Sequence, residues 1–469
     1  MKARTAVVLA LLFASAGAFA SCSAGGPDDG DGEGYDSGIG SDGDAGASGD
    51  VQPTDGSAAE AAAPDCTVLS PVTAGDWQPW SGAADAAPDG PTSPSGRAYA
   101  GLAWGRVGSL PVAILFGGGS LSAGVLGDAW RFDPSRSSWS PSPGGPGARS
   151  GLSLYFAGDM LDASAPSNGF VLFGGENQDY IGDTWRFSAG TWSLVCGGPD
   201  AGACACGPCG RAHHSIAYDS RRAQAVLFGG RTDSGPLQET WLLDAGASTW
   251  SPACATSCEA GTACCTPPSP RSDHALAYDA TRGITVLFGG TDANDNYLGD
   301  TWEWDGQVWT EAHPAHSPPA RAGHAMSAAP GTSGVVLVGG VSGSGPVRDA
   351  PWTWDGTDWT PVTVSGATPV ARAFGVMATD PVDQAALLFG GGSTGEYEDT
   401  WLLSLARTTP EGGCPAEASA PSACARLDSC CTELSNSLEQ QDCMSAVTGS
   451  NEPTCQSALS LLEDGGICP

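Results

Sequence analysis

Residues 225–230 read Ala225-Val226-Leu227-Phe228-Gly229-Gly230, an apolar run that ends in a pair of glycines. A short apolar run without polar alternation is typical of a β-strand whose two faces are both covered. The glycine pair permits a left-handed backbone and the close approach of another segment where the strand ends. This stretch therefore predicts a fully buried strand followed at once by a sharp change of direction.

The same pattern recurs six times along the chain, with further markers at steady distances from it. The glycine pairs are Gly117-Gly118, Gly174-Gly175, Gly229-Gly230, Gly289-Gly290, Gly339-Gly340 and Gly390-Gly391. A tryptophan follows 10 to 12 residues later, at Trp130, Trp185, Trp241, Trp302, Trp352 and Trp401. In five units an acid lies two residues before it, whereas the fifth unit reads Asp349-Ala350-Pro351-Trp352. Each unit opens with an arginine: Arg97, Arg149, Arg211, Arg271, Arg321 and Arg372.

This set of markers resembles the kelch repeat, in which each unit forms a four-stranded blade of a β-propeller. The resemblance covers roughly residues 72–405 and implies an all-β, six-bladed kelch-type propeller. Five units carry a second tryptophan, 7 to 9 residues after the first, but the sixth does not. Gly75-Asp76-Trp77-Gln78-Pro79 resembles Thr357-Asp358-Trp359-Thr360-Pro361 of the fifth unit. We therefore expect an N-terminal strand near residues 72–80 to complete the sixth blade and close the ring, which removes open sheet edges.

The N-terminal region predicts export. Lys2 and Arg4 precede an apolar run over residues 6–20, which suits a secretory signal over residues 1–21. Phe19-Ala20-Ser21-Cys22 resembles a bacterial lipobox, which implies lipidation of Cys22; the alternative is ordinary cleavage near Ala20. Ser23 after the cysteine favours the outer membrane. Residues 22–65 carry eleven acidic and no basic residues from Ser23 onward, so we expect a disordered acidic tether.

Composition excludes two classes of protein. The chain has 469 residues with 52 acidic and 19 basic side chains, a formal net charge of −33. A nucleic-acid binder needs a basic face for phosphate contacts, so we expect no nucleic-acid partner. A fully disordered chain is excluded, because 41% hydrophobic residues and 16 tryptophans can bury a core. Membrane contact is expected through the lipid anchor only.

The cysteines predict disulfides rather than metal sites in an oxidising compartment. Four lie in an insert between the second and third units (Cys196, Cys204, Cys206 and Cys209), and four in the next insert (Cys254, Cys258, Cys264 and Cys265). We expect a propeller domain over residues 66–410 and a disulfide between Cys66 and Cys414 that locks the closure of the ring. Residues 411–469 are expected to form a small Cys-rich helical module held by three disulfides.

Three groups of residues allow a metal-binding hypothesis, and each group also has a purely structural interpretation. His214, His274 and His324 occupy one position in adjacent units. The kelch resemblance implies that they hold blades together by hydrogen bonds rather than bind a metal. Asp292, Asn294 and Asn296 with Glu303 have oxygen ligands near calcium-loop spacing, but Tyr297 stands where such a loop needs glycine. The first cysteine insert, with His213 or His214, is the zinc alternative. No cofactor is expected.

The expected function is binding through loops on one face of the ring. Candidate ligand contacts in these loops are Asn177, Tyr180, Arg231, Asn294, Tyr297 and Tyr397. Their aromatic, amide and guanidinium groups suit a protein or carbohydrate ligand at the cell surface, although all could be ordinary turn residues. The alternatives are a propeller enzyme, carbohydrate-active or metal-dependent like galactose oxidase, and a structural envelope protein. No catalytic set can be placed on the residues, so the hypothesis leans away from an enzyme.

Overall fold

The computed structural model describes residues 72–80, 93–108, 110–158, 168–197, 207–246, 249–253, 266–381 and 384–407. All of them belong to one compact unit. Cys22, Cys66, Cys414, the expected signal and tether, and the expected C-terminal module lie outside the described residues. Within those residues every regular element is a strand, and no helix has the length and apolar character needed to span a membrane.

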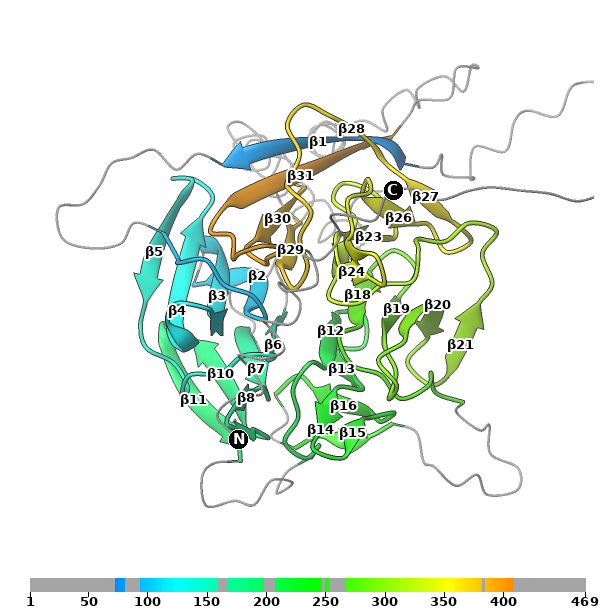
Figure 1. The fold of residues 1–469 in the computed structure, drawn as a ribbon. Helices are drawn as coiled ribbons and strands as arrows, with labels where there is room; N and C mark the ends of the chain where they lie inside the picture. Colours follow the sequence, from blue (N-terminus) through cyan, green and yellow to red (C-terminus); the bar gives the residue numbers. More distant parts are fainter. Residues whose placement is uncertain are drawn as a thin grey trace, which may run out of the picture. The chain divides into compact units, whose positions relative to one another are not determined.

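Six sheets stand around a central axis, one for each sequence repeat, and all are antiparallel apart from one strand pair in the sixth (Figure 1). Blade 1 contains β2 (Gly101–Val107), β3 (Leu110–Ser120), β4 (Gly124–Asp133) and β5 (Ser138–Ser142). Blade 2 contains β6 (Ser153–Ala157), β7 (Gly169–Phe173), β10 (Thr184–Ser188) and β11 (Thr191–Cys196). Blade 3 contains β12 (Ser215–Asp219), β13 (Gln224–Phe228), β16 (Thr240–Asp244) and β17 (Ser251–Pro252).

The second half of the ring repeats this order. Blade 4 contains β18 (Ala275–Asp279), β19 (Ile284–Thr291), β20 (Tyr297–Trp304) and β21 (Trp309–Ala312). Blade 5 contains β22 (Ala325–Ala328), β23 (Val335–Val338), β26 (Trp352–Trp354) and β27 (Trp359–Pro361). Blade 6 contains β29 (Val376–Asp380), β30 (Ala385–Phe389) and β31 (Thr400–Arg407), beside which lie β1 (Val72–Trp80) and β28 (Thr363–Ser365). The expected six-bladed all-β propeller is confirmed.

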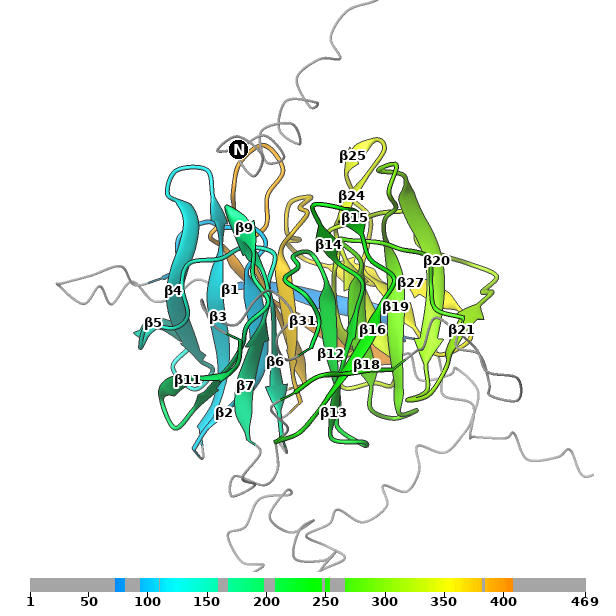
Figure 2. The ribbon, with the colours of Figure 1, turned by 90° about the horizontal axis from the view of Figure 1, so that it is seen from below.

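One end of the ring carries the loops that follow the double glycines, and we call it the loop face. It holds three short hairpins: β8 (Glu176–Asn177) with β9 (Asp179–Tyr180), β14 (Arg231–Thr232) with β15 (Gly235–Pro236), and β24 (Val341–Ser342) with β25 (Gly345–Pro346). The side view in Figure 2 places these hairpins at the same end of the molecule. Because strand direction alternates within a blade, the connections between blades reach this same end.

The core consists of six separate apolar layers, each lying between two neighbouring blades. The layer between blades 3 and 4 contains Ala217, Phe228, Leu276, Leu287 and Trp309, for example. The other five layers have the same composition in kind. Strands such as β13 and β19 are therefore buried on both faces, which explains why their sequences lack polar alternation.

The opening arginine of each repeat is buried and forms the main polar contact within its blade. In blade 4, Arg271 donates to both oxygens of Asp300 at 2.7 Å and to the carbonyl oxygen of Gly289 at 3.0 Å. The indole of Trp302 donates to the same carboxylate at 2.7 Å. Equivalent contacts join arginine, acid and tryptophan in the other five blades. The recurring sequence markers are thus one interaction.

Blade 5 keeps this interaction despite its irregular sequence. Asp349 lies three residues before Trp352, not two, yet its carboxylate accepts hydrogen bonds from Arg321 and from the Trp352 indole. The extra residue is accommodated in the chain between Asp349 and Trp352. The sequence departure therefore changes the spacing and leaves the contact intact.

The second tryptophan of a blade reaches the preceding blade. Trp309 of blade 4 packs on Phe228 of blade 3, with ring centres 5.4 Å apart, and its indole donates to Thr240 at 2.9 Å. Trp139, Trp250 and Trp359 make the same hydrogen bond to Thr400, Thr184 and Thr301. Trp192 of blade 2 packs on Phe116, but its indole nitrogen is buried without a hydrogen-bond partner among the described residues. The residue of blade 1 that corresponds to these threonines is Ala129, whose side chain has no oxygen to accept the hydrogen bond.

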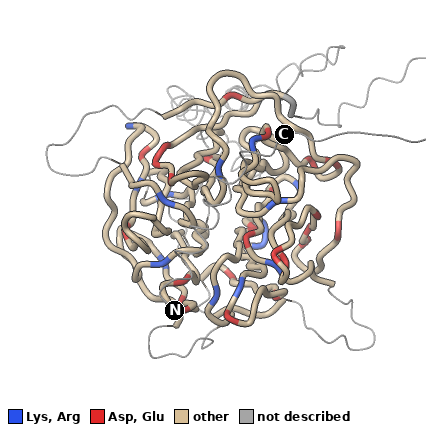
Figure 3. Tube along the Cα trace, in the orientation of Figure 1, with Lys and Arg blue, Asp and Glu red and all other residues tan. Residues whose placement is uncertain are grey.

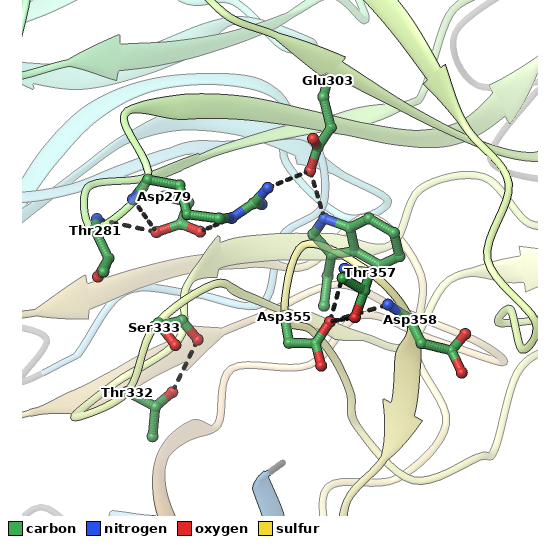
Figure 4. A network of polar contacts seen from close by, with 10 residues as sticks. Asp279, Thr281, Glu303, Thr332, Ser333, Asp355, Thr357 and Asp358 are labelled. Carbon is green, nitrogen blue, oxygen red and sulfur yellow. Dashed lines mark hydrogen bonds and ion pairs between the residues drawn. The ribbon is translucent and has the colours of Figure 1, made fainter. Parts of the chain in front are cut away.

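On the face opposite the loops, arginines join blades 3, 4 and 5. Arg282 of blade 4 bonds Asp279 at 2.6 Å and Glu303 at 2.7 Å, and Glu303 also accepts from the Trp354 indole of blade 5 (Figure 4). The guanidinium lies so close to Gly356 that an added Cβ would come within 2.8 Å of it. Glycine is therefore needed at this Asp-Gly turn for two reasons: the backbone has a positive φ, and a side chain would collide with the neighbouring arginine.

The carboxylates named in the calcium hypothesis have hydrogen-bond partners within the protein. Glu303 is engaged by Arg282 and Trp354, while the Asp292 carboxylate accepts the backbone N–H groups of Asn294 and Asn296 within its own turn. Among the described residues no group of three His, Cys, Asp or Glu side chains is placed to hold a metal ion. The turn residues Asp292, Asn294 and Asn296 stabilise the loop between β19 and β20.

Two closed rings of backbone hydrogen bonds run around the inner edge of the propeller. In the first, the residue two places after each opening arginine donates its N–H to the equivalent residue one blade back, at 2.6–3.0 Å. We call these six residues the mouth ring: Tyr99, Gly151, His213, Asp273, Gly323 and Phe374. In the second, the N–H of the second glycine donates to the carbonyl oxygen of the next blade's opening arginine, at 2.8–3.0 Å. Both rings include the junction between blades 6 and 1.

At the outer edge of blade 6, β1 lies between two other strands. It pairs antiparallel with β31, with Trp77 opposite Leu403, and parallel with β28, with Gly75 opposite Val364. Trp77 is 3% exposed and packs in the layer between blades 5 and 6, where the other blades place their second tryptophan. Trp80 contacts Phe132 of blade 1 edge to face, with ring centres 5.4 Å apart.

Candidate functional site: the loop-face mouth of the channel

The innermost strands surround a channel whose loop-face end is lined by the mouth ring. The channel has a cavity of about 180 Å³. All six mouth-ring residues have left-handed backbone, with φ between 57° and 66°. Four of them are not glycine, a conformation that is uncommon for such residues. Their inter-blade hydrogen bonds hold this conformation and direct four side chains, those of Tyr99, His213, Asp273 and Phe374, to the mouth.

Two glycines in the mouth ring allow these side chains to meet. Gly151 lies between Tyr99 and His213 in the ring, and the two aromatic rings contact edge to face at 4.8 Å. The Phe374 ring lies over Gly323, where an added Cβ would approach it to 2.3 Å, and stacks on Tyr99 at 4.2 Å. The mouth therefore has an aromatic side, formed by Phe374 and Tyr99, that continues into His213.

His213 links this aromatic side to two carboxylates. Its Nδ1 lies 3.0 Å from Asp273 Oδ1, and its Nε2 lies 3.4 Å from Glu176 Oε1. Burial alone would lower the pKa of His213, but the charge of Asp273 and the polar contact with Glu176 raise it to about 10. Burial would raise the pKa of Asp273, but His213 and, further off, Arg231 lower it. At neutral pH the imidazolium is thus an ion-pair partner of both acids.

Three of the six predicted ligand contacts converge on this cluster. Burial raises the pKa of Tyr180, and Glu176 adds to this effect, while the charge of Arg231 and a hydrogen bond with it act against it. Burial also raises the pKa of Tyr297, followed by the charge of Asp273. Burial raises the pKa of Tyr99. The charges of Asp273, Glu176 and Tyr297 raise it further, whereas the charge of Arg231 lowers it. These residues are electrostatic neighbours, and we name them the mouth cluster: Tyr99, Glu176, Tyr180, His213, Arg231, Asp273 and Tyr297.

The other three predicted contacts are not members of the mouth cluster. Asn177 is exposed in the β8–β9 hairpin, and Asn294 is exposed in the Asp292 turn. The ring of Tyr397 lies 4.6 Å from the Arg372 guanidinium carbon, and its hydroxyl bonds Ser393. Tyr397 therefore covers a buried arginine of blade 6, and its prediction as a ligand contact has no support from this arrangement.

The comparisons with known proteins agree with the fold. A family model described as the KLHDC2/KLHL20/DRC7 Kelch-repeats domain matches residues 257–437. No curated protein matches the chain. This part of the ring is similar to a kelch-repeat domain. The matched segment covers blades 4, 5 and 6 and includes the arginine, acid and tryptophan contacts of all three.

The sequence contains a further signal for the mouth of the propeller. Tyr99, His213, Asp273 and Phe374 share one offset, two residues after the opening arginine, and this position varies while its surroundings repeat. A variable position inside a regular repeat on the inner edge is a signal for a site. In the sequence, His213 stands out only as a neighbour of the cysteine insert. Cys209 in that insert is disulfide-bonded, so it supplies no thiolate for zinc.

The three channel histidines are wedged between blades. The ring of His274 contacts Phe228 of blade 3 edge to face at 5.5 Å and lies against Gly229, and His214 and His324 repeat this. Burial, aided by Arg271, lowers the pKa of His274 to about 3, although the nearby Phe228 carbonyl opposes this shift. In blade 2 the equivalent Leu152 lies against Gly117 in the same way. An apolar residue can therefore take this place. The three histidines pack against the neighbouring blade, and their ring nitrogens are buried without a hydrogen-bond partner among the described residues, unlike the expected hydrogen-bonded role.

Proposed function

We propose that this kelch propeller is a binding module whose partner is a protein that docks on the loop face over the mouth cluster. The observation that carries this proposal is the convergence of three loops on one polar and aromatic patch. Kelch domains commonly mediate protein interactions. Tyr180 comes from the β8–β9 hairpin, Arg231 from the β14–β15 hairpin, and Tyr297 from the start of β20. Residues from loops on a rigid scaffold are the usual place for recognition.

The charge of the mouth cluster supports short-range recognition. Its two carboxylates, Glu176 and Asp273, are balanced by protonated His213 and by Arg231. Figure 3 shows acidic and basic residues interspersed around the ring. A balanced cluster attracts ions weakly at long range, but it presents many donors and acceptors together with tyrosine rings. Tyrosine and arginine are also enriched among residues that dominate binding energies.

A neutral glycan is the second candidate. The same balance of charge, with three tyrosine hydroxyls and ring faces, suits a ligand that carries hydroxyl groups and no net charge. Protein and glycan differ in the area they need, because a stable protein complex buries about 800 Å² on each partner. A protein would therefore also contact the neighbouring hairpin tips, such as Asn177, whereas a short glycan would contact the mouth cluster alone.

The test is a binding screen of the full chain against envelope proteins and against an array of neutral and acidic oligosaccharides. For a true ligand, Arg231→Ala and Tyr297→Ala are expected to weaken binding at least tenfold, which corresponds to about 1.4 kcal/mol. Gln307→Ala, an exposed change in the β20–β21 turn on the face opposite the loops, is the matched control and leaves binding unchanged. Sensitivity to Asn177→Ala as well favours the protein over the glycan.

Ligands whose affinity ignores Arg231 and Tyr297 would contradict the location of the site. Chains carrying these substitutions are first compared with the wild type by urea unfolding, since the proposal concerns binding and not folding. A screen in which no protein or oligosaccharide binds through the mouth cluster leaves the structural role in the envelope as the better account.

We also propose that the propeller works outside the cytoplasm, anchored through lipid on Cys22 and held by the acidic segment that follows. The support is the sequence: a basic start, an apolar run and a lipobox-like ending. In this proposal the C-terminal residues 411–469 form the disulfide-rich module, and the predicted Cys66–Cys414 bond joins it to the chain before β1. Mass spectrometry of the mature N-terminus and of non-reduced peptides tests both points.

A further inference from the structure

The outer edge of blade 6 contains a slot for a single extended strand. Its two walls are β28, which follows blade 5, and β31, the last strand of blade 6. Eight residues of β1 pair with β31, and three of them also pair with β28. Within the slot, Trp77 packs in the same layer as Val336, Leu388 and Leu403. An added Cβ on Gly75 would approach Val362 to 3.0 Å, so the walls fit this strand closely.

The ring is closed without β1. At the junction of blades 6 and 1, Tyr99 N–H donates to Phe374 and Gly391 N–H donates to Arg97, as at every other junction. Trp139 of blade 1 bonds Thr400, and both oxygens of Glu396 accept hydrogen bonds from Ser120 and from the backbone of residue 121. None of these contacts involves residues 72–80. The strand can therefore leave its slot while the junction keeps its inner contacts.

The sequence between β1 and blade 1 is long enough to let the strand move away. Residues 81–92 read Ser-Gly-Ala-Ala-Asp-Ala-Ala-Pro-Asp-Gly-Pro-Thr, with no large apolar side chain. A fully extended chain of this length spans roughly 40 Å. Strand exchange between identical chains is cheap, because the exchanged strand makes the same contacts in its new slot as in its old one.

We propose that the slot between β28 and β31 also accepts residues 72–80 of a second copy of this chain, giving a strand-exchanged dimer. Two tryptophans of residues 72–80 make this segment the strand that fits the slot. Trp77 fills the layer between blades 5 and 6, and Trp80 packs on Phe132 of the host chain's blade 1. Within the slot, the dimer buries the same surface as the monomer. The fraction of dimer therefore depends on the chain concentration, and exchange requires that β1 first leaves its own slot. This proposal does not depend on the mouth cluster.

The test uses full-length Trp77→Asp, whose own strand cannot occupy the slot because a carboxylate replaces the buried indole. A synthetic peptide of residues 71–81 is expected to bind this variant with one-to-one stoichiometry. The same peptide with Trp77→Asp is expected to bind at least tenfold more weakly. Wild-type chain, with its slot filled, is expected to bind the peptide weakly and slowly. A folded Trp77→Asp chain that ignores the native peptide overturns the proposal.

A second measurement covers the case in which Trp77→Asp loses its fold, seen as loss of the β-sheet circular dichroism. Wild-type chain is unfolded and refolded over a range of concentrations under conditions that keep disulfides intact, and its mass is measured by light scattering. A dimer fraction that rises with concentration and reverts to monomer after refolding at high dilution is expected. Wild-type chain that remains monomeric at every concentration overturns the proposal.

Discussion

Each buried arginine near the start of a blade depends on a single carboxylate. Arg271 is fully buried and donates to both oxygens of Asp300, which is itself a quarter exposed. A buried ion pair is about as stabilising as an apolar pair of similar size. Removing only one of its two partners is destabilising, because the other charge then stays buried without a partner. The arginine, acid and tryptophan markers therefore recur because each residue requires the other two.

We expect Asp300→Asn to lower the free energy of unfolding by about 3 kcal/mol, because the buried Arg271 loses its counter-charge. Asp295→Asn is the matched control: it is the same change in an exposed loop of the same blade, where asparagine tolerates the left-handed backbone. It should alter stability by less than about 0.5 kcal/mol. Urea unfolding followed by tryptophan fluorescence measures both, and equal effects would contradict the role of the pair.

A substitution beside the Trp192 indole is expected to increase the stability of the protein. Ala129→Thr places a hydroxyl where blades 2, 3, 4 and 6 carry threonine, and this hydroxyl can accept the free indole N–H of Trp192. We expect a gain of about 1 kcal/mol. Ala129→Val has nearly the same shape without the oxygen and should show no such gain. If threonine and valine give the same unfolding midpoint, the hydrogen bond is not formed.

At the scale of the element, the innermost strands carry residues that wedge one blade against the next. His274, just before β18, must stay neutral because its pKa is lowered to about 3 by burial and then by Arg271. The unfolded histidine has a pKa near 6.5. Between these values the unfolded chain binds a proton that the folded chain does not, so this contribution to stability is present above pH 6.5 and lost as the pH falls.

We expect His274→Leu, which copies Leu152 of blade 2, to remove this dependence. Between about pH 6 and pH 4 the free energy of unfolding of the wild type should fall relative to the variant by about 1.4 kcal/mol per pH unit. Above pH 7 the difference between the two proteins should be constant. Urea unfolding across this pH range measures it, and a difference that ignores pH would show that His274 is not held neutral.

Most of the architecture could be predicted from sequence, whereas little of the site could. Glycine pairs and tryptophans recur at fixed offsets, so six blades follow from counting. The role of Asp349 was hidden because its spacing is irregular, and only the fold brings it to Arg321. Tyr397 and Tyr297 look alike in sequence, but Tyr397 covers Arg372, whereas Tyr297 is an electrostatic neighbour of Asp273 in the mouth cluster. His213 and Asp273 become neighbours only because the ring brings adjacent blades together.

At the scale of the whole molecule, the mouth ring joins six blades into one closed circle of backbone hydrogen bonds. Each member of the circle is both donor and acceptor, so a distortion in one blade is passed to two others. Gly323 is the sensitive point, because it combines φ of 59° with close contact to Phe374. Other blades place larger residues at the same backbone angle, so it is the contact with Phe374 that makes glycine necessary here.

We expect Gly323→Ala to lower the free energy of unfolding by about 2 kcal/mol, since the Phe374 ring must move away from the new Cβ. The amide protons of all six mouth-ring residues should then exchange faster, including those in blades remote from the change. Gly343→Ala, an open site on the same blade with nothing within 4 Å, is the control and should do neither. Faster exchange confined to blade 5 would contradict the closed circle.

The position of β1 determines how the protein meets mechanical load. The chain enters the ring through this strand, so a pull on residue 71 draws β1 along its own axis, past β31 and β28. Sliding a strand in this direction strains its cross-strand bonds together, whereas peeling would break them one at a time. The inner rings of hydrogen bonds join other residues, so they can stay paired when β1 slips. Such a strand would absorb tension at the edge of the propeller while the mouth keeps its shape.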